Sequence, residues 1–264
     1  MTPITKKLEL LKKAIAEGGI PKNIFKYRPD NSFTEKIITN NELWFADPSS
    51  FNDPYDCNVP ITTNISDINK WLQCIGMTDK DIDEISATVT KENLAEIANN
   101  KIQEGMKKIG VSCFSTMDDS ILQWSHYSDF HKGVCFKFNI DNEVFLTPNK
   151  VEYTKIMPRY NHCDPLNEKN EILKVIRRKF CDWSYENEIR IVKTAENILT
   201  NSGNRAFKFS DDALIEVIFG QKMTEDDCQK YMKLCKKHNK GHVLFFKMRL
   251  GDSNYYELVK ENYR

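Results

Sequence analysis

The chain of 264 residues contains no long hydrophobic run, and this excludes a membrane-spanning protein. Its longest apolar stretches, such as Val243–Phe246, fall far short of the roughly 20 residues that a spanning helix needs. The N-terminal segment has charge spread through it and lacks an apolar core followed by a small-residue cleavage site, unlike a secretory signal. We therefore expect a cytoplasmic protein with no membrane partner.

A net charge is also missing, because 38 lysines and arginines balance 38 aspartates and glutamates. No overall field attracts nucleic acid or an anionic membrane. Eight cysteines are scattered without a CxxC pair, in a chain long enough to fold on its hydrophobic core alone. We expect reduced thiols rather than a disulfide framework.

Four widespread catalytic motifs are absent: GxGxxG, GxxxxGK(S/T), HExxH and GxSxG. Rossmann, P-loop, zincin and α/β-hydrolase functions therefore have no support. His126 and His131 are five positions apart rather than four, so they diverge on a helix. No metal site is expected.

The composition, with 40% hydrophobic and 29% charged residues, is that of a folded protein. Apolar residues at helical spacing predict an N-terminal docking helix within residues 1–19. A polar stretch with spaced apolar residues predicts a helical insertion over residues 62–109. Alternating strand and helix signals elsewhere predict one α+β domain over residues 1–264, built of packed, twisted sheets.

The predicted strands and helices follow from β-rich runs, cap residues and periodicity. Strands are expected at 24–28, 43–46, 111–114, 133–138, 189–193, 214–219 and 243–250, and helices at 32–41, 120–127 and 225–237. Ser32 is expected to begin its helix with a capping box, and Thr224 to cap the last helix. Ile172, Val175, Ile176 and Phe180 are expected on one face of a further helix.

Glu186 and Glu188 form an ExE motif. If a strand begins near Tyr185, its period of two places Glu186, Glu188 and Arg190 on one face. Two carboxylates on one side can stabilise a developing cation and accept a proton, as glycosyl chemistry requires. The alternative is an exposed strand whose charges face water and pair across it.

Trp124, His126 and Tyr127 form a second candidate site. They supply a stacking surface, an imidazole and a hydroxyl, which suit a planar ring ligand. A core role for Trp124 and a structural hydrogen bond for His126 are the alternatives. Asn52 and Asp53 lie in a loop held by Asp-Pro turns, and we expect them to share this pocket unless they only cap a turn.

Six short motifs occur in chain order: Lys26–Arg28, Phe51–Asp56, Cys113–Ser115, Trp124–Tyr127, His131–Cys135 and Trp183–Glu188. Together they resemble the prokaryotic family catalogued as domain of unknown function 2971. The resemblance covers roughly residues 25–250, and the family name carries no activity.

The chain is more distantly similar to R-S-E type ADP-ribosyltransferases, in which an Arg, a Ser-Thr-Ser stretch and an ExE occur in this order. Tyr27-Arg28, Phe114-Ser115-Thr116 and Glu186-Asn187-Glu188 match, although Met117 replaces the last serine. The resemblance implies that Arg28 binds the NAD pyrophosphate, Ser115 supports the nicotinamide end, and Glu188 stabilises the oxocarbenium ion. It also implies that Glu186 orients or activates the acceptor.

The function expected from this resemblance is an NAD-using ADP-ribosyltransferase or NAD glycohydrolase with an ADP-ribosyltransferase-like fold. NAD would be the substrate, Tyr27 would join its binding site, and the acceptor would be a protein or nucleic acid. By analogy, the role would be that of a toxin or phage-defence effector with an antitoxin or defence partner. The alternative is a non-enzymatic domain that recognises a ligand or a phage protein.

Overall fold

The computed structural model describes residues 3–58, 69, 72–73, 76–88, 90, 93, 96, 100, 104–157 and 174–264. The chain divides into two compact units, which are described separately here. The first unit comprises Met1–Ala46, Val111–Lys150 and Ser184–Arg264, and the second comprises Asp47–Gly110 and Val151–Trp183. The expectation of one domain over residues 1–264 stays a prediction.

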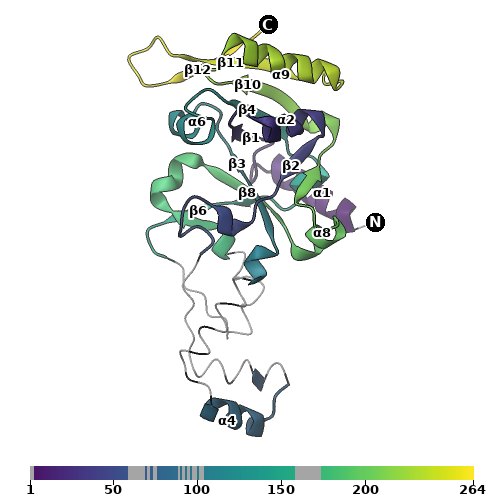
Figure 1. The fold of residues 1–264 in the computed structure, drawn as a ribbon, viewed down its shortest axis with the longest axis vertical. Helices are drawn as coiled ribbons and strands as arrows, with labels where there is room; N and C mark the ends of the chain where they lie inside the picture. The colour runs from purple at the N-terminus through teal and green to yellow at the C-terminus, as the bar shows by residue number, and fades with distance from the viewer. Residues whose placement is uncertain are drawn as a thin grey trace. The chain divides into compact units, whose positions relative to one another are not determined.

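The first unit is built on a mixed β-sheet of eight strands in the order β12-β11-β10-β4-β1-β3-β8-β5 (Figure 1). Together with the helices it gives an α+β architecture, as predicted. The strands are β1 (Asn23–Arg28), β3 (Gly110–Ser115), β4 (Val134–Asn139), β5 (Asn149–Lys150), β8 (Glu188–Lys193), β10 (Leu214–Phe219), β11 (Leu244–Leu250) and β12 (Leu258–Asn262).

The helices of this unit are α1 (Pro3–Ala16), α2 (Ser32–Thr39), α6 (Ile121–Tyr127), α8 (Ala195–Thr200) and α9 (Glu225–Lys237). Helix α9 has the predicted bounds, and the side chain of Thr224 accepts a hydrogen bond from the backbone of Asp227 as its N-cap. The predicted cap of α2 is wrong by one residue. Asn31, rather than Ser32, accepts the hydrogen bond from the Thr34 backbone, because its amide oxygen reaches the third helical N–H.

Short elements complete the first unit. Strand β2 (Glu42–Trp44) pairs with β9 (Ala206–Lys208) in a separate two-stranded sheet. The 3₁₀ turns are η2 (Glu143–Phe145), η4 (Asp211–Ala213) and the end of η3 (Cys181–Glu186). Strands β2 and β9 border the cavity described below.

The eight-stranded sheet has two buried faces, which we name after the helices packed on them. The α2 face carries Ile24 and Phe114 and packs against Ile37 of α2 in the larger hydrophobic cluster. The α6 face carries Phe25 and packs against Trp124 of α6 in the smaller cluster. Figure 1 shows α6 and α2 on different sides of β1. Alternation along each strand therefore decides which face a side chain joins.

The second unit contains η1 (Pro48–Ser50), α4 (Asp79–Thr88), β6 (Glu152–Thr154) and β7 (Arg178–Phe180). Strands β6 and β7 pair in parallel. Phe180, expected on a helix, lies at the end of β7, because pairing with Thr154 draws this segment into a strand. Ile172 lies outside the described residues, as does much of the predicted insertion at 62–109, within which α4 is helical.

Within the described part of the chain, no helix is long and apolar enough to span a bilayer. The six cysteines that the structure describes are free thiols, of which four are buried. The described residues contain no group of three or more His, Cys, Asp or Glu side chains placed to hold a metal ion.

Candidate functional site

Arg28, Ser115 and Glu188 lie on the neighbouring strands β1, β3 and β8 or at their ends. Their side chains, however, divide between the two faces. Arg28 lies four positions after Ile24 on β1, so the alternation of side chains places both on the α2 face. Ser115 pairs with Phe25 and so joins the α6 face. The structure does not bring Arg28 and Ser115 to one face of the sheet.

Glu188 also belongs to the α6 face, because Ile189 and Ile191 pack in the cluster on the α2 face. Its carboxylate forms a bidentate ion pair with Arg190: Nε is 2.8 Å from Oε1, and Nη2 is 3.0 Å from Oε2. Glu188 is 4% exposed and Arg190 is 0% exposed. The side chain predicted to stabilise a cation is therefore already matched by a buried guanidinium.

Glu186 does not lie on the strand that the sequence predicted. It ends η3, and β8 begins only at Glu188. Between them Asn187 has φ 45°, in the left-handed region that asparagine tolerates better than most residues. The expected alternation through the ExE motif is therefore broken at Asn187. Glu186 is nevertheless buried, and its Oε1 accepts a hydrogen bond from the Tyr127 hydroxyl.

Ser115 is tied into the backbone of η3. Its hydroxyl donates to the Glu186 carbonyl at 2.8 Å and accepts from the Met117 N–H at 3.1 Å. Gln123 of α6 donates to the same hydroxyl at 2.9 Å and to the Glu186 carbonyl at 3.2 Å. Gln123 and Ser115 are both buried. This network fixes η3 against α6 and gives the Ser115 hydroxyl a structural role.

The Trp124–Tyr127 cluster is divided between the core and the surface. Trp124 is fully buried, meets Tyr27 edge to face at 5.1 Å, and donates its indole N–H to the Asp118 carbonyl. Trp124 therefore has the core role that was the alternative to ligand stacking. His126 is exposed and shares a 2.9 Å hydrogen bond between Nδ1 and the Tyr185 hydroxyl. The structure brings Ser115, Glu186, His126 and Tyr127 together through α6 and η3.

Arg28 instead lines a cavity of about 420 Å³ on the α2 face, which we call the Arg28 cavity. The volume lies within the roughly 300–1,000 Å³ of ordinary small-molecule sites. Its lining residues come from β1, α2, β2 and β9 and from the turn before β9. They are Lys26, Arg28, Phe33, Lys36, Ile37, Glu42, Leu43, Trp44, Asn204 and Ala206.

The Arg28 cavity is cationic, and its charges are partly desolvated. Burial and the nearby charge of Arg28 lower the pKa of Lys26 to about 8. The Lys26 ammonium donates to the Cys113 carbonyl at 2.9 Å and to Ser112 Oγ at 3.0 Å. Burial also lowers the pKa of Arg28, which stays protonated because arginine begins so high. Two strand cations therefore line one wall beside Lys36.

Two aromatic rings and one carboxylate complete this lining. Phe33 is 70% exposed and Trp44 is 56% exposed. Exposed rings of this size beside a cavity offer stacking surface for a flat ligand. Glu42 is half-buried and accepts a 3.2 Å hydrogen bond from the Asn40 amide. The cavity can therefore take an anionic ligand that carries an aromatic ring.

No protein-family model, curated protein or solved structure matches this chain. The site is therefore assigned from its own residues and their contacts.

Asn52 and Asp53 belong to the second unit. The carboxylate of Asp53 accepts a 2.9 Å hydrogen bond from the Tyr55 N–H, which is the turn-capping alternative. Asn52 is exposed. A pocket shared by these residues and the Trp124–Tyr127 cluster stays a prediction.

The sequence reasoning missed Phe33, Lys36, Glu42 and Trp44 as lining residues. The sequence predicts Phe33 and Lys36 only as parts of a helix and Trp44 only as part of a strand, and it assigns no element or role to Glu42. One signal was available, because Phe33 and Trp44 are large aromatics at polar positions of short elements close to Arg28. The pairing of β2 with β9 could not be deduced, since about 160 residues separate them.

Proposed function

We propose that the protein binds NAD in the Arg28 cavity and acts on it as an ADP-ribosyltransferase or an NAD glycohydrolase. The observation that carries the proposal is the cavity, in which Lys26, Arg28 and Lys36 lie beside exposed aromatic rings. A protein or nucleic-acid acceptor and a toxin or phage-defence role belong to the same proposal.

The charges support a diphosphate ligand. The planar guanidinium of Arg28 matches pairs of phosphate oxygens, and the ammonium groups of Lys26 and Lys36 act as point charges. Partial burial strengthens these contacts, because water screens them less. Trp44 and Phe33 provide stacking surface for an adenine or nicotinamide ring. An NAD-sized ligand would extend beyond the cavity at its open side.

Cleavage of NAD breaks the bond between ribose C1′ and nicotinamide, with the electron pair leaving on nicotinamide. Positive charge develops on the ribose, and water or an acceptor then bonds to C1′ and loses a proton. A carboxylate beside the ribose stabilises that charge. Glu42 is the only carboxylate among the ten residues that line the Arg28 cavity, so we assign this role to Glu42 rather than to Glu188.

An ADP-ribosyltransferase-like fold is part of this proposal. Its support is the order of the strands, since β1, β3 and β8 are adjacent and carry the Arg, Ser and Glu positions. The assignment of Glu42 is a departure from the R-S-E arrangement. The departure follows from the alternation of side chains along β8, which places Glu188 on the α6 face, away from the Arg28 cavity.

One observation favours a second candidate, a non-enzymatic recognition domain. Both carboxylates of the ExE motif are buried and matched, Glu188 by Arg190 and Glu186 by Tyr127. A domain that only binds a nucleotide needs the cations of the Arg28 cavity and no catalytic carboxylate. This candidate predicts NAD binding without turnover.

Nicotinamide release from NAD tests the proposal, with cell extract supplied as an acceptor. We expect Glu42→Gln to lower turnover about 100-fold to 1,000-fold, because it removes negative charge where positive charge develops. Thermal melting run alongside tests whether the variant remains folded. Asp226→Asn, on the exposed start of α9, is the matched control and should leave turnover unchanged. Wild-type protein that binds NAD without releasing nicotinamide supports the recognition domain instead.

A further inference from the structure

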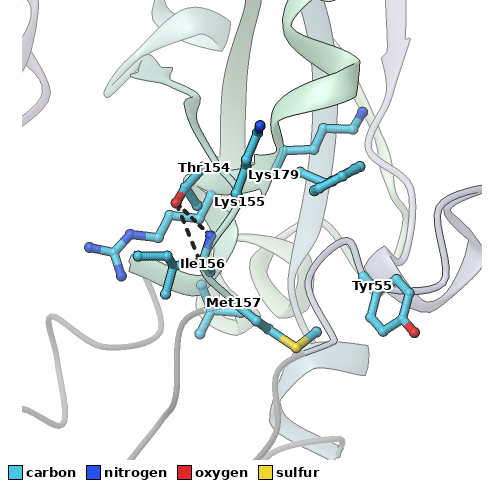
Figure 2. A pocket seen from close by; sticks show the side chains of 9 residues that line it. Tyr55, Thr154, Lys155, Ile156, Met157 and Lys179 are labelled. Carbon is cyan, nitrogen blue, oxygen red and sulfur yellow. Dashed lines mark hydrogen bonds between the residues drawn. The ribbon is translucent and has the colours of Figure 1, made fainter.

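The second unit contains a cavity of about 290 Å³, which we call the Ile156 cavity (Figure 2). It plays no part in the function proposed above. Its lining comes from the loop around Tyr55, the end of β6, Val175 and the strand β7. The residues are Tyr55, Thr154, Lys155, Ile156, Met157, Val175, Arg178, Lys179 and Phe180.

Five of the nine lining residues are apolar, and four of these five are exposed. Ile156 is 80% exposed, and Tyr55 is 67% exposed. Phe180 and Met157 add a ring and a thioether, both also exposed. Several large apolar side chains exposed around one hollow mark a binding surface more often than an ordinary stretch of protein exterior.

A tight turn after β6 holds Lys155 between Thr154 and Ile156. The Ile156 N–H donates to the Thr154 hydroxyl at 3.0 Å, which closes a tight turn around Lys155. Figure 2 shows this turn, with the Lys155 side chain projecting away from Ile156 and Met157. The ammonium of Lys155 is therefore held apart from the apolar side chains of the two residues that follow it.

The charges of the lining all have one sign. Lys155, Arg178 and Lys179 contribute cations, and none of the nine lining residues is acidic. Lys179 is buried against Asp56 at 3.5 Å, and Arg178 lies 3.5 Å from Glu152. Lys155 makes no hydrogen bond or ion pair with any residue that the structure describes. Its ammonium is the cation available to a ligand.

We infer that the Ile156 cavity binds a small amphipathic carboxylate, with its apolar body against Ile156, Met157 and Phe180 and its carboxylate on Lys155. The volume of about 290 Å³ lies just below the roughly 300 Å³ at which ordinary small-molecule sites begin, which limits the ligand to a short aliphatic chain or a single ring. No acidic side chain is among the described lining residues, which disfavours a cationic ligand. A neutral apolar ligand would offer no charged group to pair with Lys155.

Calorimetric titration of the full-length chain with octanoate, and separately with 1-octanol, tests the inference. We expect Lys155→Gln to weaken octanoate binding roughly threefold to fivefold, the effect of one exposed charge pair, and to leave octanol binding unchanged. Lys155→Arg keeps the charge and should keep the affinity. Ile156→Ser should weaken the binding of both probes roughly tenfold, because it removes apolar contact. Lys80→Gln on α4 is the matched control, since Lys80 is an exposed lysine of the same unit.

Two results would overturn the inference. One is the absence of any octanoate binding to the wild-type protein up to the solubility limit. The other is equal octanoate affinity for the wild type and Lys155→Gln, which would indicate a general apolar surface for docking a protein. Neither result bears on NAD binding, because the Arg28 cavity belongs to the other unit.

Discussion

Glu188 shows how far one residue's environment can depart from its motif. The sequence places it in an ExE motif, for which we expect either a carboxylate that stabilises a developing cation or a strand charge that faces water. In the structure its two oxygens bind Nε and Nη2 of Arg190, which is fully buried. The carboxylate is therefore needed to neutralise a buried cation, and its removal should affect folding before it affects chemistry.

We expect Glu188→Gln to lower the free energy of unfolding by about 3–5 kcal/mol, because Arg190 is left buried without its counter-charge. The double variant Glu188→Leu with Arg190→Met removes both charges and should recover much of that loss. Urea unfolding followed by circular dichroism measures both effects. A change below about 0.5 kcal/mol in Glu188→Gln would show that Glu188 behaves as a surface charge.

Lys26 gives the Arg28 cavity a pH dependence of known sign. Its pKa is lowered to about 8, so the ammonium loses its proton as the pH rises from 7 to 9, while Arg28 keeps its charge. NAD carries the same phosphate charge over this range. We expect NAD affinity to fall about fivefold from pH 7 to pH 9, through loss of one cationic contact.

Lys26→Met is the control for this pH effect. The variant lacks the titrating group, so its weaker NAD affinity should be nearly constant between pH 7 and pH 9. An equal pH dependence in the wild type and Lys26→Met would assign the effect to another group and remove Lys26 from the site.

At the scale of the element, β1 and β4 are held so closely that the position of Arg28 depends on a glycine. Gly133 precedes β4, and a β-carbon built there would lie 2.2 Å from the Arg28 carbonyl oxygen. Backbone atoms cannot yield as a flexible side chain does. The pairing of Arg28 with Val134 therefore requires glycine at position 133.

Gly133→Ala should force β1 away from β4 at Arg28, lowering the free energy of unfolding by about 1–3 kcal/mol and weakening NAD binding. Thermal unfolding and NAD titration of the same preparation measure the two effects. Gly241→Ala is the matched control, because a β-carbon there meets no atom within 4 Å. A Gly133→Ala protein as stable as the wild type would contradict the close approach of the two strands.

The elements that the sequence predicted well are those with a local signal. Helix α9 has a Thr cap and a continuous amphipathic pattern, and β10 is a short apolar run. The start of β8 was not predictable, because the left-handed φ of Asn187 interrupts a pattern that otherwise reads as one strand. Strand β12 was missed, since Leu258–Asn262 is polar and gains its strand geometry from pairing with β11.

At the scale of the whole molecule, α+β composition could be predicted and the site could not. Strand order places Arg28, Ser115 and Glu188 on neighbouring strands, as their order in the motif suggested. Their faces depend on the parity of each strand, and a shift of one residue reverses a face. The Arg28 cavity further depends on β2 and β9, which are distant in sequence. Tertiary pairing of this kind leaves no local pattern.

Calorimetric titration of NAD into the wild-type protein and into Arg28→Ala tests the central claim most directly. The claim is that the Arg28 cavity holds the diphosphate of NAD. We predict saturable NAD binding to the wild type and at least about tenfold weaker binding to Arg28→Ala, because a charge-assisted contact contributes about 1.5–3 kcal/mol. Glu225→Gln, on the exposed first turn of α9, should bind NAD as the wild type does. Wild-type protein that does not bind NAD, or an Arg28→Ala variant that binds it equally well, would contradict the claim.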